Sequence, residues 1–238
     1  MIHWLVQSTS AHPGLERGQP PPGLLSASEL ARFHTLRTPK RRHDWLLGRW
    51  TAKHLVQRFL VETTGHMAPL ATIEIKNQAD GSPSVEITNL GIGACLTISH
   101  CEELAFCALT TPQTTHGIGA DIERVRPREW NFVETFFTDA EARQVQAAAP
   151  VWRDILTTAI WSAKEAALKA VKLGLTVDTR RVECLFDPDQ RPEDAWVPLK
   201  VTYTPGALPS ATMHGWWSLR SGFVLTLIGS IGSHEIVI

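Results

Sequence analysis

The sequence predicts an α+β protein of two pseudo-symmetric halves, each a long helix packed on a small, mostly antiparallel sheet, with its functional site in the cleft between them. The chain has 238 residues, of which 43% are hydrophobic and 20% charged, enough to form cores without disulfides or metals. Two long segments, 41–61 and 151–173, carry apolar residues at helical spacing. Each follows one strand-like segment and precedes several others. The two-halves prediction rests on this repeated order alone, since no repeat of the residues themselves supports it.

The elements expected in the first half, residues 1–115, begin with a strand at 2–6. Ser26 and Glu29 have the spacing of a capping box, which predicts a short helix at 29–36. The long helix at 41–61 follows Pro39. The remaining segments alternate or carry β-type residues, and they predict strands at 73–75, 85–87, 94–98 and 104–110.

The second half, residues 116–238, is expected to repeat this order from a strand at 117–123. Thr138 and Glu141 form another capping-box pattern, so we expect Glu141 to cap a helix that ends before Pro150 rather than to act in catalysis. The long helix at 151–173 is expected to stop at Gly174, as a left-handed cap. Strands are predicted at 182–186, 197–203, 216–220 and 223–228.

Composition excludes several classes of protein. The 23 Lys and Arg against 24 Asp and Glu give a net charge of -1, which argues against a nucleic-acid-binding chain. No uninterrupted apolar stretch is long enough for a transmembrane helix, and the first residues lack the basic start of a signal peptide. The four cysteines lack zinc-type spacing. We therefore expect a cytoplasmic protein with reduced thiols, and no membrane or nucleic-acid partner.

The segment 117–123 carries the first candidate chemistry. It alternates with period two, so Gly119, Asp121 and Glu123 share one face of the strand. The two carboxylates then stand about 7 Å apart. Such a pair suits a hard cation such as Mg²⁺, which takes oxygen ligands. Taken alone, the pattern is weak and favours a solvated face at a sheet edge.

The long helix of the second half carries the other candidate residues. Trp161, Glu165 and Lys169 fall at i, i+4 and i+8 on one face. Taken alone, Glu165 and Lys169 also make an ordinary stabilising helix pair. A separate stripe is expected to pack into the core, formed by Leu156, Ile160, Ala163, Ala167 and Val171.

Three segments in this order, Gly119–Glu123, Phe136–Glu141 and Trp161–Gly174, resemble the 4′-phosphopantetheinyl transferase superfamily. With features of the first half, the resemblance covers residues 29–175, and two halves in one chain are similar to its larger, monomeric Sfp-type branch. The resemblance implies Mg²⁺-dependent transfer of the 4′-phosphopantetheine arm of coenzyme A to a serine of an acyl or peptidyl carrier protein. Adenosine 3′,5′-bisphosphate is the other product.

The resemblance also implies roles for the acidic residues. Asp121, Glu123 and Glu165 would hold the metal against the coenzyme A pyrophosphate, so Asp121 also counts among the coenzyme A contacts. Glu165 is in addition the candidate general base for the carrier serine, directly or through water. Lys169 would face the phosphates or stabilise the leaving group. The division of Glu165 between ligand and base stays open.

In the first half the resemblance implies a second cluster, which contacts coenzyme A. Ser99 and His100 match a Ser-His pair that contacts its phosphates, although Cys101 replaces the second serine of the common Ser-His-Ser form. Arg41 and Arg49 are eight residues apart, so they are expected on nearly one helix face as a clamp for the 3′-phosphate.

Weaker basic candidates and one departure accompany this cluster. Lys40, Arg42 and Lys53 belong to the same basic segment. Where relatives carry Gly-Lys-Pro this chain has Ser82 in place of the lysine, so Lys76 is a substitute candidate. Two further functions stay as alternatives: a degenerate relative that binds coenzyme A or a carrier protein without turnover, and a different Mg²⁺-dependent phosphotransferase. The second lacks support, since neither a GxxxxGK[ST] loop nor a kinase-type glycine-rich loop occurs.

Overall fold

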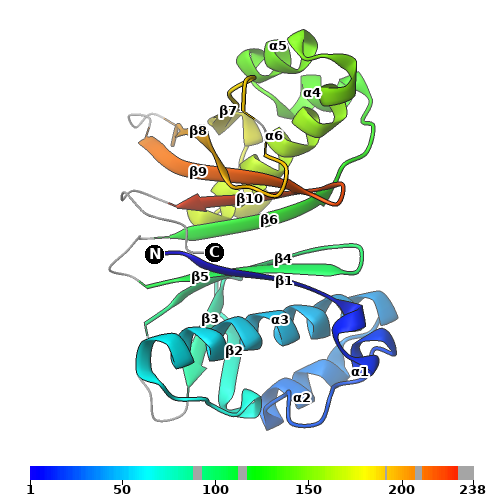
Figure 1. The fold of residues 1–238 in the computed structure, drawn as a ribbon, viewed down its shortest axis with the longest axis vertical. Helices are drawn as coiled ribbons and strands as arrows, with labels where there is room; N and C mark the ends of the chain where they lie inside the picture. Colours follow the sequence, from blue (N-terminus) through cyan, green and yellow to red (C-terminus); the bar gives the residue numbers. More distant parts are fainter. Residues whose placement is uncertain (88–92, 112–116, 191, 207–210, 230–238) are drawn as a thin grey trace. The chain divides into compact units, whose positions relative to one another are not determined.

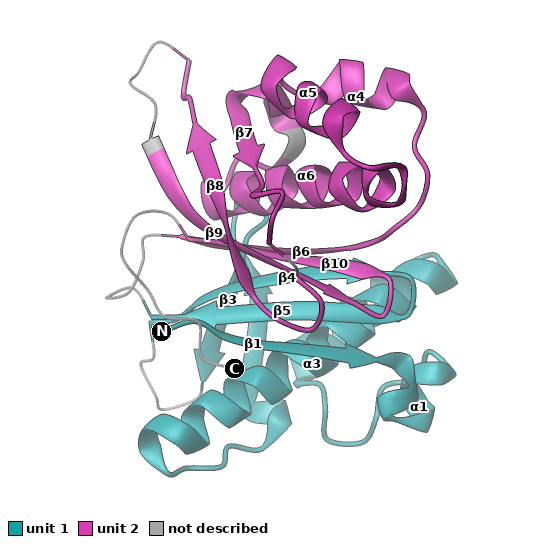
Figure 2. Ribbon diagram, turned by 45° about the horizontal axis from the view of Figure 1, so that its top comes forward, with its two compact units in different colours: residues 1–114, 234–238 teal, residues 115–233 magenta. Residues whose placement is uncertain are grey.

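The structure is a computed structural model that describes the chain except residues 88–92, 112–116, 191, 207–210 and 230–238. The described residues fall into two compact units, which we call unit 1, up to residue 114, and unit 2, from residue 115 (Figure 2). The expected boundary between residues 115 and 116 lies outside the described residues. Each unit holds one five-stranded antiparallel sheet and one long helix, so the predicted fold class is confirmed.

In unit 1, the sheet has the strand order β1-β5-β4-β3-β2, and the long helix α3 crosses one of its faces (Figure 1). The strands are β1 (His3–Ser8), β2 (Ile73–Asn77), β3 (Pro83–Ile87), β4 (Cys95–Cys101) and β5 (Leu104–Thr110). The helices are α1 (Pro13–Glu16), α2 (Ala27–Thr35) and α3 (Pro39–Thr64). Short 3₁₀ turns cover Thr9–Ala11 and Leu70–Thr72.

Local signals explain the ends of α3. The Thr38 hydroxyl accepts a hydrogen bond from the backbone N–H of Arg41 at 3.2 Å, and Pro39 opens the helix, where a missing N–H costs nothing. Gly65 ends it in the left-handed conformation, with φ of 72°. Between these ends α3 buries Leu55, Val56 and Leu60 against the sheet.

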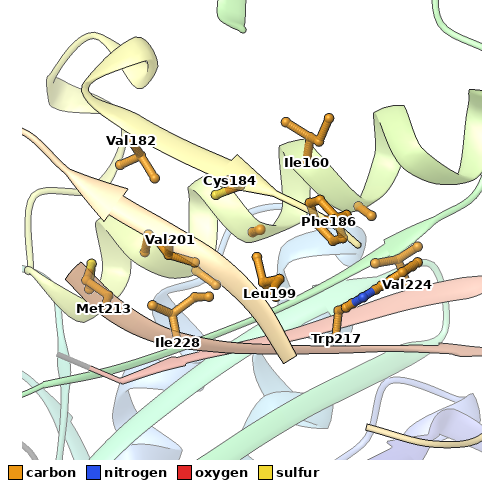
Figure 3. Close-up of a cluster of buried hydrophobic side chains, with 14 of the residues drawn as sticks. Ile160, Val182, Cys184, Phe186, Leu199, Val201, Met213, Trp217, Val224 and Ile228 are labelled. Carbon is orange, nitrogen blue, oxygen red and sulfur yellow. The ribbon is translucent and has the colours of Figure 1, made fainter. Parts of the chain in front are cut away.

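In unit 2, the strand order is β6-β10-β9-β8-β7, again antiparallel throughout. The strands are β6 (Ile118–Arg124), β7 (Val182–Leu185), β8 (Val197–Tyr203), β9 (Ala211–Arg220) and β10 (Phe223–Gly229). The helices are α4 (Trp130–Phe136), α5 (Asp139–Ala147) and α6 (Pro150–Ala170), with 3₁₀ turns at Gly174–Thr176 and Thr179–Arg181. Figure 3 shows the core between α6 and the sheet, to which Ile160, Val201 and Val224 contribute.

Two features of unit 2 differ from the predictions. Helix α4 was not expected, because its seven residues carry too short an apolar pattern to stand out. Helix α6 ends at Ala170, before the expected Gly174. The chain turns earlier because Lys172 takes the left-handed conformation, with φ of 59°, while Gly174, with φ of 52°, begins the next 3₁₀ turn.

A buried contact in unit 1 ties α2, α3 and β2 together. Glu29 is the third residue of α2, and its carboxylate completes the capping box with Ser26. It also accepts hydrogen bonds from the Lys53 ammonium of α3 and, at 3.1 Å, from the backbone N–H of Ile75 in β2. The Lys53 side chain is fully buried and also donates to the carbonyl of Leu24 at 2.7 Å. We call this arrangement the Glu–Lys tether.

Unit 2 contains the same tether. Glu141 completes the capping box of α5 with Thr138, as expected. Its carboxylate accepts from the Lys164 ammonium of α6 at 2.8 Å and from the backbone N–H of Cys184 in β7 at 2.7 Å. Both side chains are fully buried. The two long helices also share three of the four residues that end at this lysine, in Trp50–Lys53 (WTAK) and Trp161–Lys164 (WSAK).

Two sequence predictions about membranes and thiols can be compared with the structure. Among the described residues, none of the helices combines the length and hydropathy that crossing a bilayer requires. None of the four cysteines, all of which lie among the described residues, forms a disulfide, and in the β4–β5 hairpin Cys107 pairs with Ile98 rather than with another cysteine.

Candidate active site

A close approach of strand and helix positions the acidic strand of unit 2. A Cβ on Gly119 would lie 1.7 Å from the backbone oxygen of Ala166, so only glycine lets β6 pack this tightly on α6. Asp121 follows on the same face. Its carboxylate accepts a hydrogen bond from the Lys169 ammonium of α6 at 2.7 Å, and its side chain is nearly completely buried. The predicted face of Gly119 and Asp121 therefore points to α6.

Lys169 is held by the strand as well as by Asp121. Its ammonium also donates to the carbonyl of Ala120 at 3.1 Å, and about 29% of its side chain stays exposed. The Lys169 ammonium therefore lies between the buried Asp121 carboxylate and solvent, where it can contact an anionic ligand.

Glu123 lies two residues further along the same strand. Its carboxylate accepts from the guanidinium of Arg128 at 3.3 Å, and the Trp161 side chain of α6 forms a hydrogen bond with it. Burial and the neighbouring charge of Asp121 raise the pKa of Glu123, and Arg128 opposes this increase. Asp121 and Glu123 are thus electrostatically coupled, as the strand pattern predicted.

Glu165, on α6, completes the cluster. Burial raises the pKa of its carboxyl group to about 7, with further contributions from the charges of Asp121 and Glu123, while Lys169 and Arg128 act in the opposite direction. A carboxyl group with this pKa is partly protonated and partly ionised near neutrality. It can accept or release a proton at little cost, which is the property of a general acid or base.

The types of side chain in the cluster suit a divalent cation, but their positions in this structure do not form a coordination site. The charge of Asp121 raises the pKa of both Glu123 and Glu165, and these three carboxylates supply the oxygen ligands that Mg²⁺ prefers. In the described part of the chain, however, no three carboxylate, imidazole or thiol groups are arranged to hold a metal ion as they stand. Lys169 and Arg128 provide the positive charge instead.

In unit 1, Ser99 and His100 lie near the end of β4, as expected. The Ser99 side chain is buried and that of His100 is exposed. A Cβ on Gly48 of α3 would come within 2.5 Å of the His100 Nε2 atom, so this glycine makes room for the imidazole. The helix that carries the arginine candidates therefore packs directly beside His100.

The two arginine candidates have different surroundings. Arg41 is exposed in the first turn of α3, whereas Arg49 is only 7% exposed. The Arg49 guanidinium donates to the Asn77 side chain at 3.1 Å, lies 3.7 Å from the Glu29 carboxylate and stacks on Trp45. Helical spacing alone does not reveal this burial. A joint contact of Arg41 and Arg49 with a phosphate stays a prediction.

The weaker basic candidates are engaged elsewhere. Lys53 is fully buried in the Glu–Lys tether, so the reading of this residue as a phosphate contact was wrong. Lys40 pairs with Asp44 at 2.6 Å, and Lys76 pairs with Glu86 at 2.6 Å. These last two lie on the surface, where an anionic ligand could compete for them.

The sequence interpretation missed Arg128, which contacts the site directly. It follows the acidic strand in the run Arg124–Arg128 (RVRPR), where every second residue is basic. Three basic residues immediately after a candidate metal-binding strand were a usable signal, because a carboxylate cluster attracts counter-charges.

Sequence comparisons agree with the resemblance. Residues 117–208 match the family model described as the 4′-phosphopantetheinyl transferase superfamily. A curated relative, 4′-phosphopantetheinyl transferase gsp of Aneurinibacillus migulanus, is 25% identical over 123 residues, which are 52% of this chain and 47% of the relative. The chain thus spans about half the length of the curated relative it matches.

The solved structures that match part of this chain include two coenzyme A complexes. A holo-(acyl-carrier-protein) synthase from Bacillus anthracis, in complex with CoA (3′,5′-ADP), is 19% identical with a TM-score of 0.37, covering 45% of this chain and 91% of that one. The ACPS–CoA complex from Chronobacterium ammoniagenes is also 19% identical with a TM-score of 0.37, covering 47% and 96%.

Proposed function

We propose that this chain, whose residues 117–208 match the family model of the 4′-phosphopantetheinyl transferase superfamily, transfers the 4′-phosphopantetheine arm of coenzyme A to a serine of an acyl or peptidyl carrier protein. In this proposal the reaction depends on Mg²⁺ and releases adenosine 3′,5′-bisphosphate. The protein acts as a cytoplasmic monomer on carrier-protein domains, with no nucleic-acid or membrane partner.

The observation that carries the proposal is the coupled cluster of Asp121, Glu123, Glu165 and Lys169. These are the residues that the family resemblance assigns to catalysis, and β6 and α6 bring them together in unit 2. A structural salt bridge alone needs one carboxylate and one cation. This cluster instead holds three carboxylates beside two cations, and the pKa values of Glu123 and Glu165 are raised. Such an arrangement suits a site that binds charged ligands.

The chain's own residues account for the proton and the charge. As the carrier serine oxygen forms its bond to the β-phosphorus of coenzyme A, the bond from that phosphorus to the bridging oxygen breaks, and adenosine 3′,5′-bisphosphate leaves. The serine proton passes to Glu165, whose pKa of about 7 suits this step. Lys169, partly exposed beside Asp121, stabilises charge on the phosphate oxygens.

Mg²⁺ would be held by Asp121, Glu123 and Glu165, and when bound it neutralises charge on the phosphoryl group. The raised pKa values of Glu123 and Glu165 support this assignment, because a cation relieves the repulsion that causes part of each increase. If Glu165 serves as a ligand, its role as base passes through a water molecule.

Residues of unit 1 complete the proposal as coenzyme A contacts. Ser99 and His100 would donate hydrogen bonds to the pyrophosphate, and the exposure of His100 supports this role. Arg41, exposed at the start of α3, would contact the 3′-phosphate. Arg49 would need its guanidinium to reach this phosphate from a buried position beside Asn77, so Arg41 is the better supported of the two.

The test is incubation of the purified protein with a panel of apo-carrier proteins, coenzyme A and Mg²⁺, followed by mass spectrometry of the carrier. We expect one carrier class to gain the mass of one phosphopantetheine. The same carrier with its acceptor serine replaced by alanine should gain none. Coenzyme A binding without mass gain on any carrier would instead support the degenerate, binding-only alternative.

A further inference from the structure

Arg128 lies between the acidic strand and an aromatic wall. It follows β6 and precedes α4, and its guanidinium donates to Glu123 at 3.3 Å. Its charge centre lies 4.5 Å above the ring of Phe132 and 5.9 Å from the ring of Trp161. Only 17% of the side chain is exposed. The guanidinium is therefore held on one side by a carboxylate and on the other by aromatic faces.

The aromatic wall consists of three rings in mutual contact, those of Phe132, Phe136 and Trp161. The ring centroids of Phe132, Phe136 and Trp161 lie between 4.9 and 5.2 Å apart in edge-on or tilted contacts. Trp161 also forms a hydrogen bond with Glu123 and stands one helical turn before Glu165. The wall thus fixes both Arg128 and the carboxylate that Arg128 contacts.

The cluster holds more carboxylates than cations, and Arg128 is one of the few positive charges beside it. With all three carboxylates ionised, Asp121, Glu123 and Glu165 carry three negative charges, and Lys169 offsets one. Arg128 offsets a second through its direct contact with Glu123, and the charge of Arg126 also acts on Glu123. If Lys169 or Arg128 were removed, the repulsion among the three carboxylates would be stronger, because the site is partly buried.

We propose that Arg128 is a built-in counter-charge for this cluster, which holds Glu123 in the metal-free protein and competes with a divalent cation for the same carboxylate. The proposal rests on the proposed function, because it takes the cluster as the metal site. Arg128 then stabilises the empty site and weakens metal binding, since its contact with Glu123 has to loosen as the cation binds.

The test compares wild type with Arg128→Gln, Arg128→Lys and Arg124→Gln after removal of metal with a chelator. Arg124 is a matched control: as the residue after Glu123 in β6 it lies on the opposite face of the strand, where its guanidinium stacks on Phe223, and its loss changes the net charge equally. Titration calorimetry gives the Kd for Mg²⁺, and thermal unfolding gives the midpoint with and without the ion. Neither measurement depends on activity.

We expect Arg128→Gln to lower the Kd for Mg²⁺ by about 3- to 10-fold, which is the effect of a partly exposed ion pair. It should also lower the metal-free unfolding midpoint and increase the shift that Mg²⁺ causes. Arg124→Gln should leave the Kd unchanged, and Arg128→Lys, which keeps the charge, should stay within about twofold of wild type.

If a folded Arg128→Gln variant binds Mg²⁺ no more tightly than wild type does, the proposed competition is overturned. Binding of Mg²⁺ by wild type in the same experiment would still support the metal site. Should Arg128→Gln fail to fold, Arg128→Met serves the same test, because it keeps the aliphatic stack. If wild type itself binds no Mg²⁺, both the assigned metal site and the competition fail, which separates this outcome from the first.

Discussion

The two units share one scaffold and differ in the chemistry placed on it. Both sheets place the last strand of the unit beside its first, and both units bury a capping-box glutamate on a lysine of the long helix. Lys53 and Lys164 therefore mark equivalent positions of α3 and α6. This common frame lets individual residues of the two units be compared directly.

The first strands differ at the positions that face the long helix. Ser8 pairs with Leu104 and Arg124 pairs with Phe223, the first residues of β5 and β10, which aligns β1 with β6. Three residues earlier, Leu5 stands where unit 2 has Asp121. Leu5 packs on the apolar core of unit 1, whereas Asp121 binds Lys169.

The helices differ in the same way. One residue after the tether lysine, unit 1 has His54 and unit 2 has Glu165. His54 bonds the backbone carbonyl of Trp50 at 2.8 Å within its own helix, while Glu165 faces the carboxylates of β6. A few substitutions on a repeated frame thus separate a structural face from a reactive one.

The largest effect that this comparison predicts is on turnover. Glu165→Gln should lower kcat for carrier-protein modification by about 10²- to 10⁴-fold, the usual contribution of a general base. The equivalent change in unit 1, His54→Gln, should leave kcat within about twofold, because that ring bonds only its own helix. Steady-state kinetics check both variants, and a comparable loss in His54→Gln would remove the distinction between the units.

Loss of the tether lysines comes next. Lys164→Met leaves the buried Glu141 without its cation and should lower the free energy of unfolding by about 3 kcal/mol. Lys53→Met should lower it by less, because Arg49 stays 3.7 Å from the Glu29 carboxylate. Urea unfolding followed by circular dichroism measures this. At temperatures where both variants are folded, kcat should fall in Lys164→Met alone, because only Lys164 is next to Glu165 in the chain. Equal kcat in the two variants would show that the tether is purely structural in both units.

The smallest effect is on the pH dependence of stability. The pKa of Glu165 in the folded protein, about 7, lies above its ordinary value of 4.5, so the folded state keeps this proton up to a higher pH than the unfolded state does. Stability from this group is therefore complete below pH 4.5 and is lost as the pH rises towards 7. Without metal at pH 8, Glu165→Gln should unfold about 3 °C above wild type. A midpoint difference that is the same at pH 4.5 and pH 8 would contradict this.

The sequence predicted the architecture well because strong local signals mark it. The two capping boxes and the apolar periodicity located the long helices, and strand alternation placed Asp121 and Glu123 on one face. The end of α6 was misplaced, because a non-glycine residue, Lys172, takes the left-handed conformation there.

The side-chain partners that depend on tertiary packing were the harder part. Arg49 is buried beside Glu29 and Asn77, which come from α2 and β2, and helical spacing says nothing about those neighbours. Lys53 shows the same limit: a lysine reads as exposed until its buried glutamate partner is seen. The shared Trp-x-Ala-Lys pattern at Lys53 and Lys164 was readable, but it is too short to stand out without the structure.

The most direct test of the account is the stoichiometry of one reaction with wild-type protein, coenzyme A, Mg²⁺ and the carrier that gains mass. Quantitative mass spectrometry and chromatography would count modified carrier and adenosine 3′,5′-bisphosphate in the same sample. The account predicts one nucleotide released for each carrier modified, and a fall of both products by the same factor in Glu165→Gln. Nucleotide release without carrier modification would contradict it, because the unit 2 cluster would then direct phosphoryl transfer to water.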